Sequence, residues 1–112
     1  MHPFLTKLGI RSEVQELFAP HYSADSSCNL VFPYGQQAET YGMAFHRVPT
    51  TENYWLAGNS NLTFVREILI CGSAIEAIAW LHIHYHSYGQ TDSLLFLSTG
   101  AKPGPEHFRW LY

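Results

Sequence analysis

The sequence predicts an α+β fold in one domain of 112 residues, with a small antiparallel β layer followed by a βαβ unit. Two short apolar runs, 68–71 and 94–97, are typical of buried strands covered on both faces. Between them, Gly72 and Ser73 mark a turn, and residues 74–81 combine good helix formers with apolar side chains. A helical crossover of this length returns the second strand parallel to the first.

Residues 1–58 are predicted to form a helix and the antiparallel layer. Residues 2–5 are expected to be extended, because proline disfavours a helical conformation in the residue before it. A capping box from Ser12 to Gln15 then begins a short helix. Runs rich in aromatic and β-branched residues predict strands at 30–34, 41–48 and 54–57.

Residues 64–112 are predicted to hold the βαβ unit and a terminal helical piece. Ser73 is suited to cap the crossover helix, and Glu76 places a carboxylate in its first turn, where the helix dipole favours it. Gly89 is suited to the end of that helical region. Residues 106–112 follow a Gly/Pro-rich loop and are expected to be helical, with an apolar face.

Composition limits the classes of function. The chain is 46% hydrophobic but only 13% charged, which leaves a polar-neutral surface or an apolar patch covered by a partner, for example in a homodimer. Its net charge is −3 and it has no Lys/Arg cluster, unlike a protein that binds mainly by neutralising phosphates. Cys28 and Cys71 indicate free thiols in a reducing compartment, and the longest apolar segment is too polar to span a bilayer. We expect a cytoplasmic protein.

Two groups of residues are candidates for binding an anion or a nucleic acid. Gly72 and Ser73 form either an anion site at a helix N-terminus or an ordinary tight turn. The aromatic residues are either core or a stacking platform for single strands, with Arg47 and Lys102 on its rim. The aromatic set is Phe32, Tyr34, Tyr41, Phe45, Tyr54, Trp55 and Trp80.

The histidines near the end of the crossover helix are weak metal candidates. His82 and His86 have the spacing that places two ligands on one helix face, and His46 or His107 would have to supply a third. Histidines are also favoured near a helix C-terminus by the dipole. The sequence therefore predicts no bound metal.

Residues 71–77, Cys-Gly-Ser-Ala-Ile-Glu-Ala after an apolar strand, resemble the first motif of the Toprim domain of bacterial primases and topoisomerases. Gly72 stands where that family carries its catalytic glutamate, so the motif is degenerate and only Glu76 retains its acid. The resemblance also gives Arg47 the place of a basic residue that the family directs toward its cleft. It implies the front part of a primase-like core, without the Asp-x-Asp that helps to hold Mg²⁺.

The resemblance implies a catalytically silent module of DNA replication or mobile-element DNA processing that binds single-stranded DNA or a replication or mobilisation protein. One alternative is a protein-interaction or regulatory domain with no role on nucleic acid. Another is metal-dependent phosphoryl transfer, which needs Mg²⁺ and carboxylates supplied from beyond Tyr112.

Overall fold

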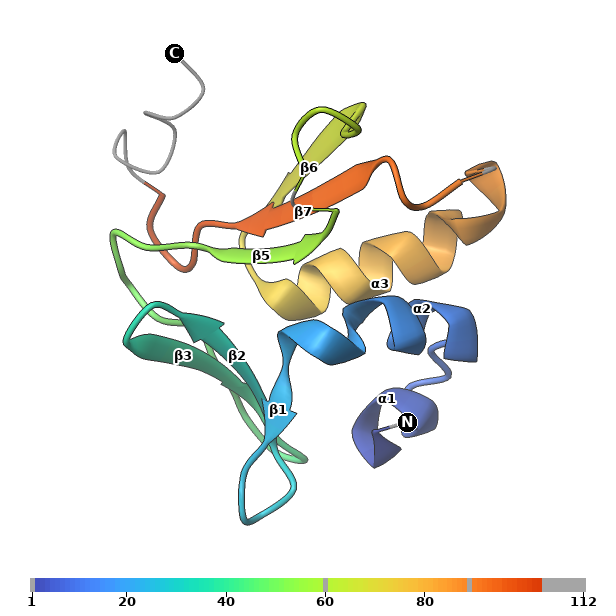
Figure 1. The fold of residues 1–112 in the computed structure, drawn as a ribbon. Coiled ribbons are helices and arrows are strands. Elements are labelled where there is room, and N and C mark those ends of the chain that lie inside the picture. The colour runs from blue at the N-terminus through green and yellow to red at the C-terminus, as the bar shows by residue number, and fades with distance from the viewer. Residues whose placement is uncertain (1, 60, 89, 104–112) are drawn as a thin grey trace.

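The computed structural model describes residues 2–59, 61–88 and 90–103, and Figure 1 shows their arrangement. The α+β fold class is confirmed. The helices are α1 (Pro3–Lys7), α2 (Ser12–Phe18) and α3 (Ala74–His84), with 3₁₀ turns η1 (Ala19–His21) and η2 (Tyr85–Ser87). The strands are β1 (Ser23–Ala24), β2 (Leu30–Tyr34), β3 (Gln37–Tyr41), β4 (His46–Arg47), β5 (Trp55–Gly58), β6 (Glu67–Cys71) and β7 (Leu94–Ser98).

The described strands form two sheets. Sheet A is antiparallel in the order β1-β2-β3-β4, and sheet B has the order β5-β7-β6. Within sheet B, β6 runs parallel to β7 from the pair Glu67 and Leu94 to the pair Cys71 and Ser98. The predicted βαβ unit is therefore confirmed, with α3 as its crossover (Figure 1).

The predictions for the first 18 residues are partly wrong. Residues 3–7 are helical, because Pro3 occupies the first turn and the ring nitrogen Nδ1 of His2 accepts a hydrogen bond from the Phe4 amide at 3.1 Å. Helix α2 is present, but Ser12 is not its cap and no side chain caps it. The Gln15 side chain is buried and instead donates to Oγ1 of Thr6 at 3.3 Å and to the Ile10 carbonyl at 2.9 Å, which ties α2 to α1 and to the loop that follows α1.

The hairpin prediction is wrong in its register. A two-residue turn at Gly35 and Gln36 follows β2, so the return strand β3 occupies 37–41, and the predicted strand 41–48 reduces to β4. Gly35 has a φ of 64°, the left-handed conformation that short hairpin turns require. The strand predicted at 54–57 is present as β5, but it pairs antiparallel with β7 in sheet B.

Strand β6 is not covered on both faces as expected. It lies at the edge of sheet B, and Ile70 leaves 51% of its surface exposed. Strand β7 lies in the middle, and all five of its residues are buried. Two similar apolar runs thus have different environments, because position within the sheet decides burial.

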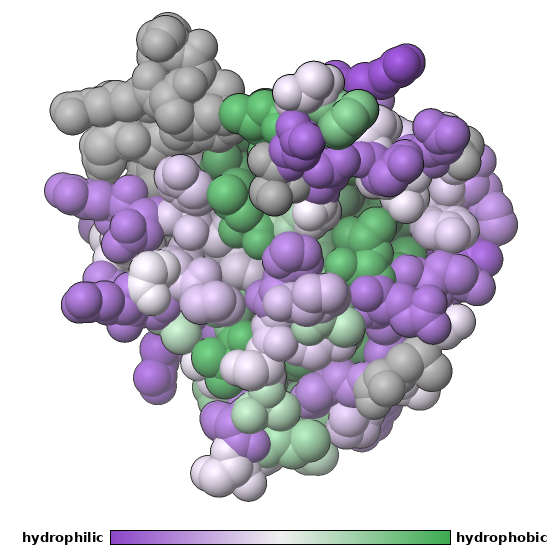
Figure 2. All heavy atoms as spheres, in the orientation of Figure 1, coloured by the Kyte–Doolittle hydropathy of each residue, from purple (hydrophilic) through white to green (hydrophobic). Residues whose placement is uncertain are grey.

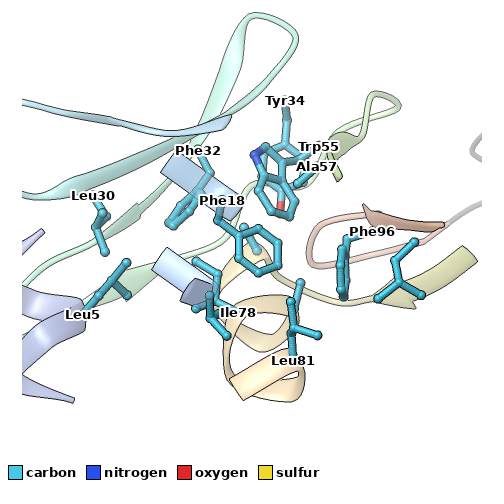
Figure 3. Packing of buried hydrophobic residues seen from close by; sticks show 14 residues of the cluster. Leu5, Phe18, Leu30, Phe32, Tyr34, Trp55, Ala57, Ile78, Leu81 and Phe96 are labelled. Carbon is cyan, nitrogen blue, oxygen red and sulfur yellow. The ribbon is translucent and has the colours of Figure 1, made fainter. Parts of the chain in front are cut away.

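One hydrophobic core joins both sheets to α2 and α3 (Figure 3). Phe32 of sheet A meets Trp55 of sheet B edge to face, with ring centroids 5.6 Å apart. Phe18 of α2 lies between Trp55 and Phe96, at 6.0 and 5.0 Å from their ring centroids. The large aromatic residues of the two sheets therefore share one interior.

Some predictions lie outside the described residues, namely the helix end at Gly89, the terminal helix at 106–112 and the ligand role of His107. In the part of the chain that the structure describes, every helix is too short or too polar to cross a membrane.

Candidate functional site

The candidate site is the edge of sheet B where the parallel strands β6 and β7 end. Ligands of α/β folds commonly bind at the carboxyl ends of parallel strands. Here the chain leaves β6 through Gly72 and Ser73, and it leaves β7 through Thr99, whose amide donates to the Cys71 carbonyl at 3.1 Å. The Glu39 side chain of sheet A reaches the same edge, where it accepts a hydrogen bond from the Ala74 amide.

Glu39 is the chemical centre of this edge. Its carboxylate is fully buried and lies against the first turn of α3. Oε1 accepts hydrogen bonds from the Tyr34 hydroxyl at 2.6 Å and the Ala74 amide at 2.7 Å. Oε2 accepts from the Ile75 amide at 3.3 Å and from Nε2 of His46 at 2.7 Å. These four donors match the acceptor capacity of a carboxylate.

The amides at the start of α3 are consequently engaged within the protein. Ala74 and Ile75 donate to Glu39, and the Gly72 amide donates to Oε2 of Glu76 at 3.1 Å. The Glu76 amide donates to Oγ of Ser73 at 3.1 Å, so the predicted cap is confirmed. Carboxylates of this chain therefore occupy the positions at which an external anion would meet the Ala74, Ile75 and Gly72 amides.

The polar network continues from Glu39 to β7. The Tyr34 hydroxyl donates to Glu39, so at its 2.6 Å contact with Ser98 it accepts from the Ser98 hydroxyl. Ser98 in turn accepts from the Gly100 amide at 3.3 Å. Burial, followed by the hydrogen bond to Glu39, raises the pKa of Tyr34, which stays a neutral donor.

Arg47 and Lys102, the two cations predicted on the rim, are both exposed. Arg47 ends β4, two residues before Pro49, and Lys102 directly follows Ala101. The Ala101 amide donates to the Pro49 carbonyl at 2.9 Å, which brings the two segments together. His46 of β4 contacts Glu39, and because side chains alternate along a strand, the next residue, Arg47, directs its side chain to the opposite face of sheet A. The structure thus joins the segments that carry Arg47 and Lys102, while Gly72 and Ser73 lie together in the turn before α3.

The two histidines predicted as weak ligands contact Arg11 instead. Nδ1 of His82 accepts from the Arg11 amide at 3.1 Å, and Nε2 of His86 lies 2.8 Å from the guanidinium of Arg11. A guanidinium only donates, so Nε2 of His86 is the acceptor. His46 is committed to Glu39. Across residues 2–59, 61–88 and 90–103, no three His, Cys, Asp or Glu side chains are grouped so that they could hold a metal ion.

Cys71 is not a reactive thiol, and the central aromatic residues are not exposed for stacking on bases. Burial, and secondarily the Glu76 carboxylate, raises the pKa of Cys71 to about 11, which keeps it a thiol at neutral pH. Phe32, Tyr34 and Trp55 are almost completely buried, so these three members of the predicted stacking platform belong to the core.

Glu39 is a site residue that the sequence does not predict. Its only local signal is an acid in a strand next to uncharged residues, in Gln-Ala-Glu-Thr-Tyr, which is also typical of an exposed strand face. Its partners Tyr34, His46 and Ala74 come from three other elements, so no single stretch of sequence predicts the hydrogen-bond network.

Comparisons with protein-family models, with curated proteins and with solved structures found no match to this chain. The fold and this edge define it as an α+β protein with a parallel βαβ unit, in which Glu39 accepts hydrogen bonds from amides at the N-terminus of α3.

Proposed function

We propose that this chain is a catalytically silent, Toprim-like module that serves bacterial DNA replication or mobile-element DNA processing by binding single-stranded nucleic acid. The observation that carries the proposal is the parallel β6–α3–β7 unit, with Gly72 in the turn that opens α3. In the resembling family this turn carries the glutamate of the active site. The resemblance extends over residues 71–77, at the carboxyl edge where ligands of such folds bind.

Catalytic silence follows from the acids at this edge. Gly72 has no side chain to offer, and all acceptor positions of Glu39 are filled by donors of the chain. Glu76 is exposed, but its Oε2 accepts from the Gly72 amide. Phosphoryl transfer with Mg²⁺ needs several oxygen ligands that converge on the ion, so these three positions do not supply a magnesium site.

Nucleic-acid binding would use exposed cations and not the helix amides. Arg47 and Lys102 are exposed, and the hydrogen bond between Ala101 and Pro49 holds their segments together. Two cations contact few phosphates, and the net charge is −3, so we propose weak binding with a shallow salt dependence.

Fluorescence anisotropy of a labelled single-stranded oligonucleotide tests this proposal. We expect saturable binding in 20 mM salt that weakens in 150 mM salt. The double variant Arg47→Ala/Lys102→Ala should weaken binding at least tenfold, whereas Arg66→Ala/Lys7→Ala, which removes equal charge elsewhere, should change it less than threefold. If the anisotropy does not change with protein concentration at either salt concentration, the nucleic-acid role is wrong.

A protein-interaction module is the second candidate function, and exposed apolar side chains favour it. Leu62, Phe64 and Ile70, all in or just before β6, leave 56%, 64% and 51% of their surfaces exposed. Figure 2 shows apolar surface near the top of the view, where Figure 1 draws β6. Such side chains on a soluble domain are typical of a surface that meets another chain.

A further inference from the structure

The free edge of β6 is the part of the molecule best prepared to bind another chain. In sheet B, as far as the structure describes it, β6 pairs only with β7. The Glu67 amide donates to the Ser93 carbonyl, and the Cys71 carbonyl accepts from the Thr99 amide, so these odd-numbered residues direct their backbone groups toward β7. Because direction alternates along a strand, the backbone groups of Ile68 and Ile70 point to the open side.

The other described sheet edges are protected. Strands β1 and β4, at the two edges of sheet A, have only two residues each. The outer edge of β5 is covered at its end, where the Gly58 amide donates to Nε2 of His21 at 3.4 Å. Short or covered edges are the usual means by which proteins avoid edge pairing. Strand β6, with five residues and a half-exposed isoleucine, has neither protection among the residues that the structure describes.

We propose that a second copy of this chain occupies this edge, through antiparallel pairing of β6 with β6 about a twofold axis at Leu69. In this register Ile68 of each copy lies opposite Ile70 of the other. Their outward amides and carbonyls then form four hydrogen bonds. The isoleucines meet as cross-strand apolar pairs on the outer sheet face, and the two three-stranded sheets become one six-stranded sheet.

Charge also favours a second copy as the occupant. The same register places Arg66 of one copy opposite Gly72 of the other, beside the exposed Glu76 carboxylate that accepts from Gly72. Glu67 lies opposite the neutral Cys71. No like charges are therefore opposed across the paired strands, and each copy brings an arginine toward an acid.

This inference rests on the second candidate function and identifies its partner. Failure of the β6 pairing can be distinguished from failure of the nucleic-acid role. DNA binding is measured by fluorescence anisotropy, whereas self-association is measured by the mass of the particle in solution. An anisotropy response from a strictly monomeric protein would support the nucleic-acid role and remove the pairing.

Sedimentation velocity of the 112-residue chain between 5 and 200 µM tests the pairing. We expect a concentration-dependent dimer. Ile70→Lys should shift the protein to monomer, because it places a charge within the paired edge, while Met43→Lys, on a side chain that is 78% exposed elsewhere, should leave the dimer intact. Unchanged circular dichroism would show that both variants fold. A wild-type monomer throughout, or an Ile70→Lys dimer, would overturn the proposal.

Cross-linking tests the register. In a Cys28→Ser background, Glu67→Cys should form an intermolecular disulfide with the native Cys71 of the second copy on oxidation with copper phenanthroline. The matched variant Cys28→Ser/Cys71→Ser/Glu67→Cys should give at least tenfold less cross-linked dimer on a non-reducing gel. Equal cross-linking with and without Cys71 would contradict this register and with it the proposal.

Discussion

Glu39 is the residue whose burial most constrains this molecule. An ionised carboxylate in a protein interior is tolerated only when donors surround it, and Glu39 has a helix terminus, a tyrosine and a histidine around it. The helix dipole of α3 adds a favourable term for the negative charge. One side chain of sheet A thereby fixes where α3 begins relative to that sheet.

Replacing Glu39 is expected to be costly. Glu39→Ala leaves the Tyr34 hydroxyl and the Ala74 amide without their acceptor in a buried site, and we expect a loss of about 3 kcal/mol or more in the free energy of unfolding. Urea denaturation measures it. Glu16→Ala, an acid on the exposed face of α2, is the control and should leave the midpoint unchanged. Equal midpoints for the two variants would show that the Glu39 network contributes little.

His21 makes stability depend on pH. Burial lowers its pKa, and its Nε2 accepts from the Gly58 amide, so the folded protein favours the neutral ring. Since unfolded histidine titrates near pH 6.5, the unfolded state binds more protons just below that pH, and stability should fall as the pH drops from about 7 to 5. His21→Gln should show a smaller fall in thermal midpoint over this range. Parallel curves for wild type and variant would contradict the assignment.

At the scale of single elements, the start of α3 follows from local sequence. Ser73 has the extended backbone and side-chain contact of an N-cap, and the acid three residues on reaches back to the Gly72 amide. The similar Ser12-x-x-Gln15 pattern does not form a capping box, because the buried Gln15 side chain donates to Thr6 of α1 and to the Ile10 carbonyl instead. The same local signal has two outcomes, decided by what packs around it.

Two serine variants compare the contribution of each serine to the stability of its helix, α3 or α2. Ser73→Ala removes the acceptor of the Glu76 amide and should cost about 1 kcal/mol of stability. Ser12→Ala is its matched control at a helix whose cap makes no side-chain hydrogen bond, so we expect a much smaller effect. Thermal or urea denaturation of both variants checks the order. A larger loss for Ser12→Ala would show that α2 is capped after all.

At the scale of the whole molecule, the two sheets share one hydrophobic core. Phe32 and Trp55 come from different sheets and meet edge to face, and Phe18 joins Trp55 to Phe96 of β7. A shared core of this kind predicts one cooperative unfolding transition for a chain of 112 residues.

A substitution in sheet A should therefore destabilise sheet B equally. Phe32→Ala should cost about 3–5 kcal/mol, and tryptophan fluorescence and far-ultraviolet circular dichroism should lose their signals at the same, lowered midpoint. Phe45→Ala, on a ring that is 45% exposed, should have a small effect. Separate transitions for the two signals would mean that the sheets unfold independently.

The sequence by itself determined the parallel β6–α3–β7 unit, its cap at Ser73 and the strand β2, since apolar runs, turn residues and capping patterns are local. The tertiary structure alone decided which apolar run is central, that β5 joins sheet B, and that Glu39 occupies the start of α3. These features depend on contacts between residues distant in the chain, such as the 35 positions between Glu39 and Ala74, and hydrophobic periodicity carries no information about partners.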